Sequence, residues 1–81
     1  MRRQSMLARY YFHVFNGPIA ARDHIGVDCY NETGAFSYAE RVIRELKDAG
    51  GYDDTSLSIL IEDAAGREVC SIKFSSVARS N

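Results

Sequence analysis

The first part of the chain is patterned as a strand and a tight turn. From Arg9 to Phe15, aromatic and β-branched residues occupy almost every position, which is typical of a strand with two partly covered faces. Asn16-Gly17 follows and favours a type I′ hairpin turn, because both central residues of that turn need a positive φ. Pro18 cannot donate a ladder hydrogen bond, so we expect the returning strand, about residues 19 to 23, to be a weak edge strand.

The middle of the chain changes to a helical spacing. Asp23-His24-Ile25-Gly26 predicts a turn in which the aspartate accepts backbone N–H groups. Between Glu32 and Ala49, apolar residues then recur at spacings of one, three and four, which predicts one long helix. Asn31 is suited to cap its start, and Gly50-Gly51 supplies the stop.

The last part of the chain predicts a second hairpin. Two strands, Leu57 to Ile61 and Val69 to Phe74, are joined by Asp63-Ala64-Ala65-Gly66, which has turn residues at the required positions. Residues after Ser75 show no periodicity. We therefore expect a flexible basic extension over residues 1–7, a single domain over residues 8–75 and a frayed tail over residues 76–81.

The element order predicts an α+β fold, in which one helix packs on one face of a four-stranded antiparallel sheet (strand-strand-helix-strand-strand). Alternation assigns a set of apolar residues to the helix side: Tyr10, Phe12, Val14, Leu57, Ile59, Ile61, Cys70, Ile72 and Phe74. The opposite side, called here the open face, has a mixed character. Six of its residues are the candidate interaction residues: Tyr11, His13, Phe15, Leu60, Val69 and Lys73.

Composition narrows the class of protein. The 81 residues carry a formal net charge of −1, and all eleven acidic residues lie between Asp23 and Glu68, which excludes a binder whose affinity rests on bulk positive charge. Two cysteines do not make the disulfide framework of a small secreted domain. Arg9 interrupts the start before an export signal forms, and no apolar run is long enough to span a membrane. We therefore expect a cytoplasmic protein.

The residues that carry chemistry are few. His13 in mid-strand is expected to be a half-exposed sheet residue, and His24 a turn residue. A zinc set of Cys29, Cys70, His13 and His24 has none of the usual short ligand spacings, so we expect no metal, cofactor or catalytic residue. We interpret both cysteines as structural thiols, with the pKa of Cys29 lowered by the helix that follows it.

Several segments together resemble a known family. They are Arg9-Tyr10-Tyr11-Phe12-His13-Val14, the Asn16-Gly17 turn, Asp23-x-x-Gly26, the alanine-bearing helix with Arg41, and Ile61-x-Asp63-x-x-Gly66-Arg67. The chain resembles, over about residues 8 to 74, a family of short bacterial proteins of about 70–80 residues that is frequent in rhizobia and related proteobacteria and is known only as a domain of unknown function. Its members typically begin just before the aromatic strand, so the resemblance makes Met6 an alternative start to Met1. The resemblance implies no activity.

Two function classes remain open. The first is a non-enzymatic interaction or regulatory module that associates through the open face with itself or with a protein partner. The alternative is a single-stranded nucleic-acid-binding or antitoxin-like regulatory protein, because Tyr11, Phe15 and Lys73 give the open face an aromatic and basic character on which bases stack. The element order is also similar to that of HicB-type antitoxins, but the Pro-Asp-x-Pro-Gly segment and the DNA-binding tail of those proteins are missing.

Overall fold

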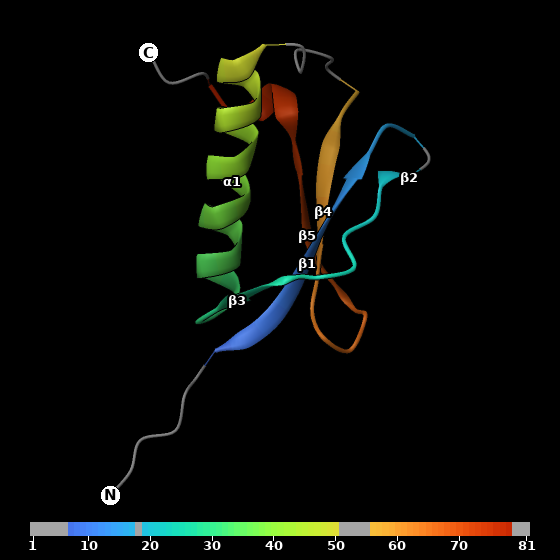
Figure 1. Cartoon of the computed structure of the whole chain (residues 1–81), viewed down its shortest axis with the longest axis vertical. Helices are drawn as coiled ribbons and strands as arrows, with labels where there is room; N and C mark the ends of the chain where they lie inside the picture. Colours follow the sequence, from blue (N-terminus) through green and yellow to red (C-terminus); the bar gives the residue numbers. More distant parts are fainter. Residues whose placement is uncertain (1–6, 18, 51–55, 79–81) are drawn as a thin grey trace, which may run out of the picture.

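Five strands and one long helix form the part of the chain that the computed structural model describes, residues 7–17, 19–50 and 56–78 (Figure 1). In chain order they are β1 (Ala8–Phe15), β2 (Ile19–Ala21), β3 (Val27–Cys29), α1 (Glu32–Ala49), β4 (Ser58–Glu62) and β5 (Glu68–Lys73), followed by a short 3₁₀ turn, η1 (Phe74–Ser76). All strand pairs are antiparallel, in the order β2-β1-β4-β5, and β3 also pairs with β1. The predicted α+β fold with one helix on an antiparallel sheet is confirmed.

Two short strands share one edge of β1. β3 pairs with its first half, from Ala8 to Tyr10, and β2 pairs with its end, at Val14 and Phe15. The sequence predicted β2 from the Asn16-Gly17 hairpin turn that precedes it, but not β3, because three residues are too few to show a period by themselves. On this edge, residues 11 to 13 of β1 therefore lie after the stretch that pairs with β3 and before the stretch that pairs with β2.

Helix α1 begins and ends where the sequence predicts. The Asn31 side chain accepts a hydrogen bond from the Gly34 backbone N–H at 2.8 Å, which satisfies one of the free donors at the helix start. At the other end, Gly50 has a φ of +90° and its N–H donates to the Lys47 carbonyl at 3.1 Å.

The helix covers only part of its side of the sheet. It packs against β3, β4 and β5. In Figure 1 it stands beside β5 and β3, and β2, at the opposite edge of the sheet, is the strand farthest from it. The largest fully buried side chains come from this contact region: Phe74, Ile43, Ile59 and Ile61. Phe12 and Val14 of β1 were predicted to lie on the same side, and they do pack against the core, but they remain only half-buried.

The segment after β5 packs against the end of α1. It includes the first residues of the tail predicted over residues 76–81: Ser76 closes η1, and Val77 is buried in the core, with 4% of its surface exposed. The Lys47 amine donates to the carbonyls of Phe74 and Val77 at 2.8 and 2.6 Å, which joins the end of α1 to this segment. The rest of the predicted tail after residue 78, and the predicted N-terminal extension apart from Leu7, lie outside the described residues. No described helix has the length and apolar character needed to cross a membrane.

Candidate functional site

The strand register brings most of the candidate interaction residues together on the open face. Directly opposed residues in antiparallel strands point to the same face. Tyr11 lies opposite Glu62, His13 opposite Leu60 and Phe15 opposite Ser58. Lys73 is added at the outer strand, where it lies opposite Ser58 and is exposed.

Val69 does not join this group. The β4–β5 pairing shifts between Ile61 and Glu62: Ile61 lies opposite Cys70, and Glu62 opposite Glu68, which leaves Val69 as the extra residue of a β-bulge. Val69 is half-buried and packs against the core. Its predicted position on the open face assumed an unbroken alternation, which the bulge interrupts.

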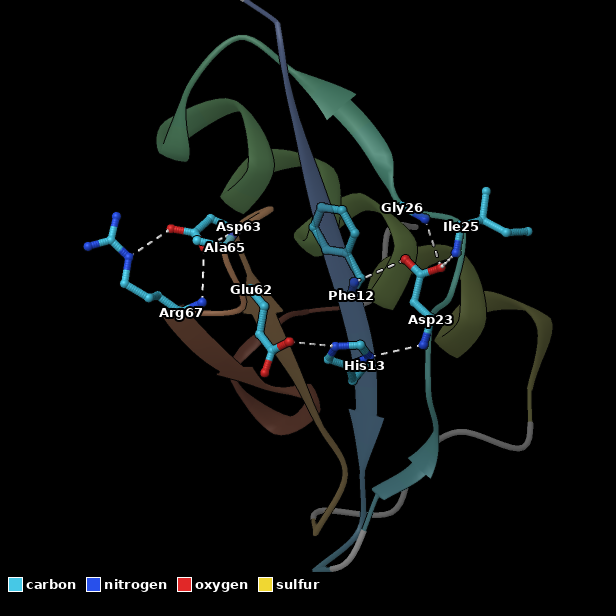
Figure 2. A network of polar contacts seen from close by, with 9 residues as sticks. All are labelled: Phe12, His13, Asp23, Ile25, Gly26, Glu62, Asp63, Ala65 and Arg67. Atoms are coloured by element: carbon cyan, nitrogen blue, oxygen red, sulfur yellow. Dashed lines mark hydrogen bonds and ion pairs between the residues drawn. The ribbon is translucent and has the colours of Figure 1, made fainter.

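His13 is buried rather than half-exposed, with 3% of its surface accessible. Figure 2 shows its ring between Glu62 of β4 and Asp23, which follows β2. Its Nε2 lies 3.1 Å from Glu62 Oε1, and its Nδ1 accepts the Asp23 backbone N–H at 2.9 Å. Nδ1 therefore has no proton to donate, so Nε2 carries the ring hydrogen and donates it to Glu62. Through its two ring nitrogens, His13 of β1 is thus joined to β4 and to the segment that follows β2.

The Asp23 side chain fills the gap between β2 and β3 on the edge of β1. Its Oδ2 accepts the Phe12 backbone N–H at 3.1 Å, a donor that has no strand partner there. Its Oδ1 accepts the N–H groups of Ile25 and Gly26 at 2.9 and 3.0 Å, as the predicted turn required. Figure 2 shows these contacts on one side of β1.

Asp23 is ionised more readily than an ordinary aspartate. Partial burial is the largest single influence and raises its pKa, but the N–H donors of Gly26, Ile25 and Phe12, with a smaller contribution from His13, together lower it below the usual value. The carboxylate is thus a fixed negative group that replaces a strand partner.

The open face has two shallow hollows of different character. One, of about 250 Å³, is lined by Phe15, Leu60, Ser58 and Ser71 among others. The second, of about 290 Å³, lies around Tyr11 and His13 and has charges of both signs at its border: Arg22, Asp23, Glu62 and Asp63. His24, predicted as a turn residue, is exposed beside it.

A third hollow lies on the helix side and was missed by the sequence analysis. It has a volume of about 330 Å³ and lies between Phe12 and Val14 of β1 and Tyr38 and Val42 of α1. Ile25, with 77% of its surface exposed, stands at its border. The sequence placed Phe12 and Val14 on the helix side and Ile25 in a turn, but periodicity does not say how far a helix extends across a sheet.

The two cysteines are free thiols, as predicted. Cys29 is buried, and burial, with a smaller effect from Asp28, raises its pKa. The expected lowering by the helix dipole is therefore wrong, because loss of solvation outweighs it. Burial, with the charges of Glu32 and Glu68, also raises the pKa of Cys70. Within the described residues no group of three or more His, Cys, Asp or Glu side chains is placed to hold a metal ion.

Comparison with curated proteins gives no match, and neither does comparison with solved structures. A family model does match, over residues 9–75, which include every described strand and the helix apart from the first residue of β1. The chain therefore belongs to the family described as a domain of unknown function (DUF6894).

Proposed function

We propose that this protein is a non-enzymatic interaction or regulatory module that binds a protein partner, a second copy or another chain, through the open face. The observation that carries the proposal is the hollow of about 250 Å³ between half-buried Phe15 and Leu60, on the sheet face opposite α1. Apart from Glu68, the side chains that line this hollow are apolar or carry a hydroxyl group, and such a hollow accepts a protruding apolar side chain of a partner.

The geometry of His13 supports a role without catalysis. A general base needs a ring nitrogen that is free to take a proton from a substrate. In this protein Nδ1 accepts the Asp23 N–H and Nε2 donates to Glu62, so both nitrogens serve the fold. The free thiols of Cys29 and Cys70 support a reducing, cytoplasmic location as part of the same proposal.

Substitution of Phe15 tests the proposal. We expect the immobilised wild-type chain to form a complex with a protein partner captured from an extract of its host. Phe15→Asp should lose that complex and keep its thermal unfolding transition, because Phe15 is only half-buried. Phe36→Asp is the matched control, since Phe36 is 39% exposed on the helix, away from the open face. Equal complex formation by all three proteins would refute the proposal.

Single-stranded nucleic-acid binding, including an antitoxin-like role, is the second candidate. Tyr11 and Phe15 offer stacking surfaces, and Lys73 a positive charge. Glu62 and Glu68 stand among them on the same face and repel phosphate. We expect a labelled oligonucleotide to bind no more tightly than about 100 μM at physiological salt. A micromolar complex that weakens with salt and in Tyr11→Ala would favour this candidate instead.

A further inference from the structure

Strand β5 ends the sheet with an outer edge that no described strand pairs. The Phe74 N–H donates to the Leu57 carbonyl at 2.9 Å, in continuation of the β4–β5 ladder. Hydrogen-bonded pairs alternate along an antiparallel ladder. Ile72 and Cys70 therefore direct their backbone groups toward β4, whereas Lys73 and Ser71 direct theirs outward.

The side chains at the two ends of β5 carry opposite charges. Glu68 lies at its start and Lys73 at its end, both exposed, and neither forms an ion pair within the described part of the chain. Glu68 also lies directly opposite Glu62 of β4. Like charges in opposed positions destabilise a sheet, so a cation placed beside Glu68 would be favourable.

We infer that two copies of this chain pair through their β5 edges, antiparallel, with Ser71 at the two-fold axis. In this register Ser71 faces the second copy's Ser71, and each Lys73 lies beside Val69 and Glu68 of the other copy. The outward backbone groups of Ser71 and Lys73 then find partners, and two Glu68–Lys73 ion pairs form on the open face. On the helix side, Cys70 lies opposite the second copy's Ile72, which continues the apolar surface.

A second copy fits this edge better than an unrelated strand does. Bulges and lysines on an edge strand discourage indiscriminate pairing. With the bulge at Val69, one register places each Lys73 beside a Glu68 of the partner strand. Antiparallel pairing of β5 with a second β5 about Ser71 has this register. The pairing joins the open faces of both copies into one continuous sheet surface.

Exchanging the charges tests the inference. Light scattering over a concentration series should show a dimer for the wild-type chain. Lys73→Glu and Glu68→Lys should each weaken it at least about tenfold, because each places like charges together. The double variant Glu68→Lys with Lys73→Glu should restore the dimer, since it recreates both ion pairs with the charges reversed. Circular dichroism melts should show all three variants folded, because both residues are exposed.

Amide hydrogen exchange gives a second readout that depends on the edge itself. The N–H groups of Ser71 and Lys73 should be protected in the wild-type dimer and exchange rapidly in Lys73→Glu, while that of Ile72 stays protected in both. A monomeric wild-type chain at about 100 μM, or a double variant that stays monomeric, would overturn the inference. A dimer that Phe15→Asp dissociates and Lys73→Glu does not would also overturn it, and would assign association to the open face as in the proposed function.

Discussion

Asp23 is the residue on which the edge of β1 depends most. One carboxylate accepts three backbone N–H groups, and its own N–H donates to His13. Carboxylates that accept several backbone donors are stabilised in the charged form. Local order between β2 and β3 is therefore linked to the ionisation of a single side chain.

This link predicts an acid-dependent loss of stability. The folded-state pKa of Asp23 lies below its unfolded value of about 3.9, so its contribution is fully present above that pH and is lost as the pH falls through the lowered folded-state pKa. Urea unfolding measured at decreasing pH should show the free energy of unfolding falling below about pH 4. Asp23→Asn should be less stable than wild type at pH 7 and lose less on acidification. An unchanged pH slope in this variant would contradict the assignment.

Gly26 meets two constraints at once. Its φ is +78°, and a β-carbon there would lie 2.6 Å from Arg9 Cδ and 2.9 Å from the Tyr10 carbonyl oxygen. We expect Gly26→Ala to lower the free energy of unfolding by about 2 to 4 kcal/mol, the sum of backbone strain and steric displacement. Gly66→Ala is the control, because Gly66 has a φ of +85° with nothing within 4 Å of the added carbon. Its cost should be about 1 kcal/mol, and equal costs in urea titrations would show that the close approach is unimportant.

The thiols should react in the order of their exposure. Cys29 is 8% exposed, whereas Cys70 is more accessible, and burial raises the pKa of both. Thiolate formation and access together set the rate of alkylation. Timed labelling followed by peptide mass spectrometry should therefore find Cys70 modified before Cys29. The reverse order would mean that the segment around β3 opens readily.

At the scale of elements, the sequence predicted the strands and the helix whose hydrophobic residues recur with a regular local spacing. The β1 strand, α1 and the β4–β5 hairpin have long periodic patterns with suitable turns at their ends. β3 escaped prediction because three residues show no period and, unlike β2, it follows no hairpin-turn pair such as Asn16-Gly17. The Val69 bulge escaped because one extra residue leaves no mark in composition. The burial of His13 escaped because its partners lie 10 and 49 residues away. On the open face, the predicted residues of β1 and β4 do lie together, but His13 at their centre is buried, whereas alternation alone led us to expect a half-exposed residue.

The Lys47 side chain joins the end of α1 to the segment around η1, and substituting it tests how much this contact stabilises the fold. Its amine donates to two carbonyls of the segment around η1, while its stem leaves the last turn of the helix. Lys47→Met should lower the free energy of unfolding by about 1 to 3 kcal/mol, because two charge-assisted hydrogen bonds are lost. Glu45→Met on the exposed side of the same helix should change it by less than about 0.5 kcal/mol. Similar values for the two variants would show that the carbonyls are satisfied equally well by water.

At the scale of the whole molecule, the small core allows only a modest free energy of unfolding. Among the residues that the structure describes, four large side chains are fully buried, and single small domains are stable by about 5 to 15 kcal/mol. Ile61→Ala should cost about 2 to 5 kcal/mol and leave the chain near its unfolding threshold. Val14→Ala, at a half-buried position beside the helix-side hollow, should cost about 1 kcal/mol. Thermal melts of both variants decide this, and a larger loss for Val14→Ala would mean that its hollow is closed in solution.

The use of a side chain between β2 and β3 also affects how this chain can vary. A strand ladder transmits register, so that one inserted residue reverses every side chain beyond it. The Asp23 carboxylate transmits none, because it imposes no two-residue period on the residues after it. β2 and β3 therefore each take their facing from their own pairing with β1, and neither inherits it from the other through the turn. The turn instead fixes the length of the connection, because the same carboxylate binds the N–H groups of Ile25 and Gly26, so a residue inserted there would break these bonds without reversing the side chains of either strand.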